Sequence, residues 1–172
     1  MTQPRTNQSI DSAVRIGHIH LKVANLEKSI AFYSGILGFE VTQRLGSQAA
    51  FLSAGGYHHH IGLNTWESLG GSPPPRGHTG LYHVAIVYPG REQLADALKR
   101  LLDAGIRLDG ASDPDDNGVE LYWDRPKEQW PKTADGHLSM YTRPLDLRGL
   151  LAETSQVSRP ERIPDSTGPK DL

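Results

Sequence analysis

The chain repeats one arrangement of predicted elements, and its second copy begins 65 positions after the first. Residues 16–23 alternate as a strand does, and residues 26–37 place apolar side chains near helical spacing. The same strand and helix recur within residues 81–104, so that His83 falls on His18. Because each half alone would bury too little surface to be stable, we expect two modules in one domain.

The two copies differ after their helices. The first continues with three short strand-like segments at 39–45, 49–53 and 57–64, and therefore has the order β-α-β-β-β. The second has only residues 106–108 and an acidic turn sequence before its last clear strand at 119–123. We therefore expect the order β-α-β-β in the second copy, with one strand missing. The fold class expected is α+β.

Composition changes divide the chain further. The ends are polar and lack periodicity, and a Gly- and Pro-rich stretch separates the two copies. We expect one domain over residues 14–150. It would consist of module one (14–69), a connector (70–80), module two (81–125) and a C-terminal extension (126–150). Disordered tails would flank it at 1–13 and 151–172.

The composition excludes several classes of function. The chain has no cysteine, which rules out disulfides, thiolate nucleophiles and sulfur-ligated metals, so a metal site would use His, Asp and Glu. Its net charge of −2, with acids and bases mixed, provides no field that would attract nucleic acid or anionic lipid. No apolar run approaches the ~20 residues that span a bilayer. We expect a cytoplasmic protein without nucleic-acid or membrane partners.

Three residues form a candidate metal site. Equivalent strands related by a pseudo-twofold axis can direct His18 and His83 into one cavity, and Glu120 in the last strand would supply a carboxylate. Two imidazoles and one carboxylate leave positions open on an ion, as in non-haem iron(II) oxygenases. Each residue alone is more simply explained as a hydrogen-bonded or solvent-facing side chain. The recurrence of His at the same place in both copies favours the metal site.

The run from Tyr57 to His60 contains three consecutive histidines. In a continuous strand, His58 and His60 would share one face and His59 would lie on the other, so at least one imidazole would face the pocket. A surface run that binds metal adventitiously is an equally good interpretation.

An acidic segment that starts at Asp113 begins like a calcium-binding loop. A calcium loop has a bidentate Glu at its twelfth position, whereas this segment has Asp124 there, so it is better explained as a β-turn.

Five segments together resemble the vicinal oxygen chelate superfamily, which includes glyoxalases, bleomycin-resistance proteins and extradiol dioxygenases. These segments are Gly17-His-Ile-His-Leu-Lys-Val-Ala-Asn-Leu26, Ala31-Phe-Tyr through Leu37-Gly-Phe, Gly55-Gly-Tyr-His-His-His-Ile-Gly-Leu-Asn-Thr-Trp66, Gly80-Leu-Tyr-His83 and Asn117-Gly-Val-Glu-Leu-Tyr-Trp123. The chain is most similar to single-domain proteins like catechol 2,3-dioxygenase, over residues 14 to 150. The resemblance implies two β-α-β-β-β-type modules that form a curved mixed sheet around a metal pocket.

The resemblance also implies roles for particular residues. The ligands of the family fall on His18, His83 and Glu120, which agrees with the interpretation of the repeat. In ring-cleaving members the acid/base histidine matches His59, and in glyoxalase-type members a fourth ligand matches His60. Further candidates for a ligand or a substrate contact are His20 and Tyr122. The strand missing from module two carries, in relatives, a His and a Tyr that approach the substrate.

The leading functional hypothesis is an extradiol dioxygenase that uses Fe(II) or Mn(II) and O2 to cleave a catechol-like aromatic. One alternative is a glyoxalase- or epimerase-type enzyme that uses Ni(II) or Zn(II) on a dicarbonyl-type substrate. Another is a non-catalytic module that binds a small molecule. Related two-module proteins often pair as dimers, so a homodimer is a candidate assembly.

Overall fold

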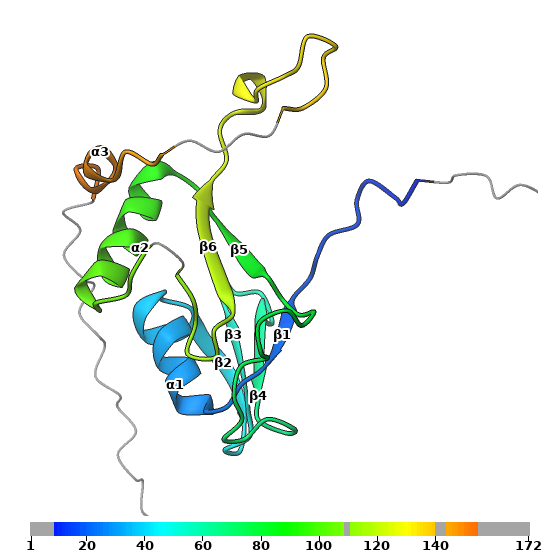
Figure 1. Cartoon of the computed structure of the whole chain (residues 1–172), viewed down its shortest axis with the longest axis vertical. Helices are drawn as coiled ribbons and strands as arrows, with labels where there is room; N and C mark the ends of the chain where they lie inside the picture. The colour runs from blue at the N-terminus through cyan, green and yellow to red at the C-terminus, as the bar shows by residue number, and fades with distance from the viewer. Residues whose placement is uncertain (1–8, 109–110, 140–143, 155–172) are drawn as a thin grey trace, which may run out of the picture.

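Module one forms a four-stranded mixed sheet with a helix on one face (Figure 1). The computed structural model describes residues 9–108, 111–139 and 144–154. The elements of module one, in chain order, are β1 (Ile19–Lys22), α1 (Leu26–Ile30), the π-helical turn η1 (Ala31–Ile36), β2 (Glu40–Leu45), β3 (Ala49–Ser53) and β4 (Ile61–Asn64). The strand order is β1-β4-β3-β2, with β1 parallel to β4 and the other pairs antiparallel. The predicted order β-α-β-β-β is confirmed.

The first helix begins and ends where local chemistry requires. The Asn25 side chain accepts a hydrogen bond from the backbone N–H of Lys28 at 3.0 Å, which satisfies a donor that the first helical turn leaves free. The helix then widens into η1, where the N–H of Leu37 donates to the carbonyl of Phe32, five residues earlier. Gly38 follows with φ of 90°, a conformation that favours glycine, and the helix ends there.

The strand predicted at 57–64 is shorter than expected. Gly55 and Gly56 both have positive φ, and β4 begins only at Ile61. His58, His59 and His60 therefore lie in the connection between β3 and β4, not in a strand. The expectation that strand alternation would divide these three histidines between two faces is wrong, because the alternation begins after them.

Module two has a smaller sheet than module one. Its elements are β5 (His83–Tyr88), α2 (Arg91–Asp103) and β6 (Gly118–Trp123), and the two strands pair in parallel. In the described part of this module, residues 106–108 form no strand, although one was expected there. Among the described residues that precede the acidic turn, Ser112 forms an isolated bridge to Gly118 and does not extend it into a ladder. The whole is a mixed α+β fold, as predicted.

The C-terminal extension contains a 3-10 turn, η2 (Lys127–Gln129), and a short helix, α3 (Leu147–Leu151). Leu150 is buried against α2, and the guanidinium of Arg91 donates to both carboxylate oxygens of Glu153 at 2.7 to 3.0 Å. Together these contacts attach residues 147–153 to module two, so the attached segment crosses the predicted boundary at 150 between the extension and the C-terminal tail. Most of the predicted tails, at 1–8 and 155–172, lies outside the described residues. No described helix is long and apolar enough to cross a bilayer.

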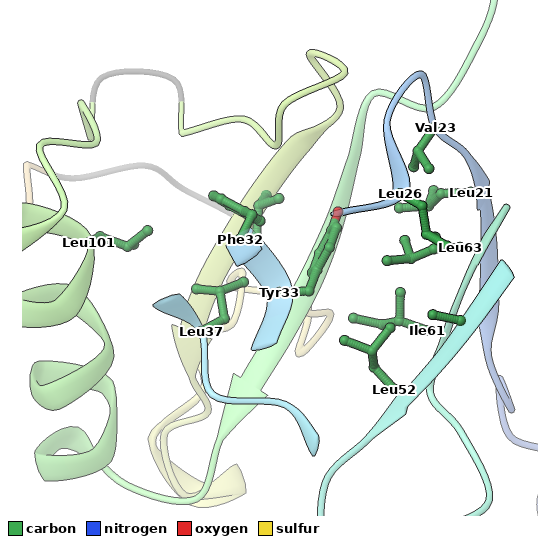
Figure 2. Packing of buried hydrophobic residues seen from close by; sticks show 12 residues of the cluster. Leu21, Val23, Leu26, Phe32, Tyr33, Leu37, Leu52, Ile61, Leu63 and Leu101 are labelled. Atoms are coloured by element: carbon green, nitrogen blue, oxygen red, sulfur yellow. The ribbon is translucent and has the colours of Figure 1, made fainter. Parts of the chain in front are cut away.

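One hydrophobic core joins the two modules. Helices α1 and α2 lie on the same side of the strands (Figure 1), and Figure 2 shows Leu101 of α2 near Phe32 and Leu37 of module one. Leu101 and Val119 belong to the same buried cluster as the apolar side chains of β1, β3 and β4. The Arg100 side chain also donates to the carbonyls that end the first helix. The modules therefore pack as a single unit.

The acidic turn before β6 fastens module two to module one. Asp113 is buried and accepts a hydrogen bond from the hydroxyl of Tyr33 at 2.9 Å. Asp115 accepts from the backbone N–H of Ala24 at 2.8 Å and from the hydroxyl of Ser29 at 3.3 Å. The interpretation of this segment as a β-turn is confirmed, and its carboxylates bind the first helix and its cap region.

Candidate functional site

Module two places two metal-type donors side by side. His83 begins β5, and Glu120 of β6 pairs across the parallel ladder with Ala85, two residues after His83. The side chains of His83 and Glu120 are on the face opposite α2, because their neighbours Val84 and Val119 point into the core. Nε2 of His83 lies 3.1 Å from Oε2 of Glu120, and the side chains are 41% and 52% exposed. An ion in solvent can therefore reach both atoms.

Module one places imidazoles at the equivalent position. His18 directly precedes β1, and by strand alternation it shares the open face with His20, since Leu21 is buried. Its ring lies 4.5 Å from the ring of His59, centroid to centroid. The Nδ1 atoms of His58 and His59 are 2.7 Å apart, so one of them must carry a proton and donate to the other.

This concentration of imidazoles favours neutral rings. Burial lowers the pKa of His59, and the neighbouring His18, His58, His20 and His60 lower it further, because each would repel an added positive charge. Burial and His18 likewise lower the pKa of His20. Near neutral pH, both rings are therefore available to accept a proton or to bind a metal.

The structure separates His59 from His60. Nδ1 of His60 lies 3.1 Å from the hydroxyl oxygen of Ser53, and its ring stacks 4.8 Å from Tyr57. Of the two, His59 is the ring beside His18. Tyr122 is half-buried and is two residues beyond Glu120 in β6, so it shares the open face with that carboxylate.

The structure brings the candidate ligands together in pairs. His83 lies with Glu120 and His18 lies with His59, but in the described ranges no three His, Asp or Glu side chains are placed so that they could hold one metal ion. Imidazole nitrogen and carboxylate oxygen are donors that suit divalent iron, manganese, nickel and zinc. In donor chemistry and exposure, the pair in module two fits such an ion.

At equivalent rungs, the two strand pairs carry their large polar side chain on different strands. His20 pairs with Gly62 in module one, and Ala85 pairs with Glu120 at the equivalent rung of module two. A Cβ atom at Gly62 would lie 2.9 Å from the ring of His20, so the large side chain of one strand needs a small residue on the other. The large polar residue of this rung is therefore His20 on the first strand (β1) in module one, but Glu120 on the last strand (β6) in module two.

A cavity of about 980 Å³ runs beside β6. It reaches both faces of the small sheet, and His83 and Glu120 line it together with Leu94 and Leu98 of α2. Module one has β3 at this place, whereas β6 in the described part of module two has only β5 as a full neighbour. The shortened module thus opens space next to the metal-type donors. The sequence signalled this only through the missing strand.

Sequence reasoning missed two aromatic residues beside His20. Phe51 of β3 and Trp66 after β4 have ring centroids 6.0 Å and 5.7 Å from that of His20. Phe51 also lies 5.0 Å from His59. The alternation of β3, with Leu52 in the core, could have placed Phe51 on the open face, but no local signal marks Trp66.

Comparison with known proteins adds a family and a fold. The family described as "Glyoxalase/Bleomycin resistance protein/Dioxygenase superfamily" matches residues 15–141. A protein of Bacillus subtilis (strain 168), named catechol-2,3-dioxygenase, is 37% identical over 169 residues. That match covers 92% of this chain but only 58% of the relative, so the chain spans little more than half of that protein's length.

Solved structures agree on the fold. A glyoxalase/dioxygenase from Nostoc punctiforme is 19% identical with a TM-score of 0.54, and the match covers 69% of this chain and all of that one. A glyoxylase/bleomycin resistance protein/dioxygenase domain from Frankia sp. EAN1pec is 24% identical with a TM-score of 0.53, covering 66% of this chain and all of that one. At these identities the likeness shows the fold alone.

Proposed function

This chain belongs to the glyoxalase/bleomycin resistance protein/dioxygenase superfamily, and from that premise we propose that it is a metal-dependent extradiol dioxygenase acting on a catechol-like aromatic. The observation that carries the proposal is the contact between His83 and Glu120, Nε2 to Oε2 at 3.1 Å, on the open face of module two. The relative named catechol-2,3-dioxygenase supports the choice of reaction within the superfamily.

His83 and Glu120 would hold the ion, and His18, at the repeat-equivalent position of module one, would be the third ligand. Fe(II) and Mn(II) suit this mixture of nitrogen and oxygen donors. When bound, such an ion supplies Lewis acidity and a template that orients the substrate. The chain supplies the ligand geometry, since His83 and Glu120 are fixed by adjacent strands of one ladder.

His59 is the proposed acid/base residue. Its ring lies next to that of His18, a predicted metal ligand, and packs edge-on against Phe51. It is therefore close to the predicted metal site but is not paired with the carboxylate of Glu120. A neutral imidazole in that position can take a phenolic proton from a catechol. His60 is a poorer candidate because its Nδ1 is already within hydrogen-bond distance of the Ser53 hydroxyl and its ring packs against Tyr57.

The proposal is tested with full-length protein loaded with iron(II) under nitrogen and then given a panel of catechols in air. We expect oxygen uptake and a yellow ring-opened product. His59→Ala should lower kcat by about 10²- to 10⁴-fold while metal content is retained. His83→Ala and Glu120→Ala should both lower metal content, and His137→Ala, on an exposed part of the extension, is the matched control. Metal-loaded protein that consumes no oxygen with any catechol would contradict the proposal.

One observation favours a second candidate, a binding module without turnover. In the part of the chain that the structure describes, no three metal-capable side chains are placed to hold one ion, and β6 lacks the second neighbour that β4 has. This candidate predicts saturable binding of a catechol with no product. His59→Ala would then leave the affinity largely intact, whereas the enzyme proposal requires that it reduce turnover.

A further inference from the structure

We propose that the aromatic substrate carries an uncharged linear alkyl chain, and that the cavity beside β6 binds this chain between β6 and the helices α2 and α3. The inference rests on the proposed function, which places the aromatic ring at His83 and Glu120. It goes further because it assigns the other side of the small sheet, the side that faces α2, to one class of substituent.

The cavity joins the metal-type donors to an apolar wall. His83 and Glu120 line it on the open face of the small sheet, and leucines line it on the face toward α2. A substituent on a ring held at His83 and Glu120 can therefore follow one continuous space around the edge of β6. The leucines that it would reach are Leu94, Leu98 and Leu101 of α2, Leu121 of β6, and Leu147 and Leu150 of α3.

Part of this apolar wall is left uncovered. Leu94, Leu121 and Leu147 are each only partly buried. In module one, β3 covers the equivalent edge of β4, and its Ala50 and Leu52 are fully buried there. An alkyl chain in the corresponding space of module two would remove its own surface and that of the leucines from water, so the gain should grow with chain length.

The dimensions of the cavity suit a linear chain. Every residue of Gly118–Trp123 lines it, so it follows β6 for about 17 Å at the rise of a parallel strand. Its volume of about 980 Å³ is at the upper end of the range of ligand pockets, about 300 to 1,000 Å³. A peptide strand fits less well, because Ser112 already bridges Gly118 and the N–H of Val119 already donates to the carbonyl of Ala111. An alkyl chain needs no backbone partner.

The charges at the end of β6 favour a chain without a charged end. Arg91 is bound to Glu153, and Asp146 is a further negative charge near it. Arg125, which also lines the cavity, directly follows Asp124 in the chain. Positive charge is therefore not in excess at this end, and a carboxylate on the chain would lose hydration among the leucines for little attraction.

The first test uses full-length, metal-free protein in a chelator, titrated in a calorimeter with 4-propylphenol and 4-hexylphenol. These probes have the ring and the chain but lack the second hydroxyl of a catechol. Burial of the chain should tighten Kd by about 2- to 4-fold for each added methylene, the upper value corresponding to about 0.8 kcal/mol. Equal affinities for the two phenols would overturn the proposal.

Variants locate the chain in the cavity. Leu94→Gln should remove most of the advantage of 4-hexylphenol over 4-propylphenol. Leu145→Gln should reduce it too, and because Leu145 lines the cavity but is 63% exposed, its replacement leaves the core intact. Leu138→Gln is the matched control, since Leu138 is 58% exposed and does not line the cavity. Equal losses in Leu145→Gln and Leu138→Gln would also overturn the proposal.

A second arm separates this inference from the proposed function. With iron(II)-loaded protein, kcat/KM should rise from 4-propylcatechol to 4-hexylcatechol by a similar factor for each methylene. A chain-length effect on binding without any oxygen uptake would contradict the dioxygenase and support the cavity assignment. Oxygen uptake that does not depend on chain length would support the dioxygenase and overturn the cavity assignment.

Discussion

Replacing Tyr33 by phenylalanine removes one hydrogen bond that joins the modules. The Tyr33 hydroxyl is fully buried and donates to Asp113 at 2.9 Å. A hydrogen bond to a carboxylate contributes about 1.5 to 3 kcal/mol. Asp113 would still accept from the N–H groups of Asp115 and Asn117, so it is not left without partners. We therefore expect a loss at the lower end, about 1.5 kcal/mol, or ~3 to 6 °C in Tm.

The pH dependence gives a second measure of the same contact. Burial, followed by the nearby Asp113, raises the pKa of Tyr33 above its usual value. A tyrosine pKa that is raised by folding contributes stability below about pH 10, the value in unfolded chains, and that stability is lost as the pH rises further. The wild-type protein should therefore lose stability above about pH 10 more steeply than Tyr33→Phe.

Urea unfolding followed by circular dichroism measures the change, with Cm expected to fall while the slope m stays constant. Tyr82→Phe is the matched control, because Tyr82 is 89% exposed and its replacement should change stability by less than about 0.5 kcal/mol. If Tyr33→Phe unfolds at the same urea concentration and keeps the wild-type pH profile, then the turn does not hold the modules together.

Two further predictions concern the core and the extension. Leu101→Ala should lower the free energy of unfolding, measured in urea, by about 2 to 5 kcal/mol, because Leu101 is buried in the shared core. Leu102→Ala is the control and should lower it far less, because Leu102 is 39% exposed. Similar losses for the two variants would argue against one common core. Arg91 lowers the pKa of the Glu153 carboxyl, so the attachment of α3 should be present above pH 4.5 and weaken at lower pH. Glu153→Gln should speed hydrogen exchange in α3 at neutral pH, and an unchanged rate, equal to that of Glu128→Gln, would refute this role.

Much of module one was predictable because its signals are local. The Asn25 cap, the helix stop at Gly38 and the strand at 49–53 each depend on residues within a turn or two, and all three are confirmed. The strand at 57–64 was predicted too long. Its apolar and aromatic residues satisfy a strand pattern, but the positive φ angles of Gly55 and Gly56 extend the connection as far as His60.

The sequence by itself determined that the chain is duplicated, that each module opens with a histidine, and that module two is short, because periodicity and repeat spacing are properties of neighbours along the chain. Only the tertiary structure decided which side chains meet. It pairs His83 with Glu120 and His18 with His59, and it binds Asp113 to Tyr33, 80 positions away. Those contacts depend on how two sheets and two helices pack around one core, and burial of apolar surface sets that packing without regard to distance along the chain.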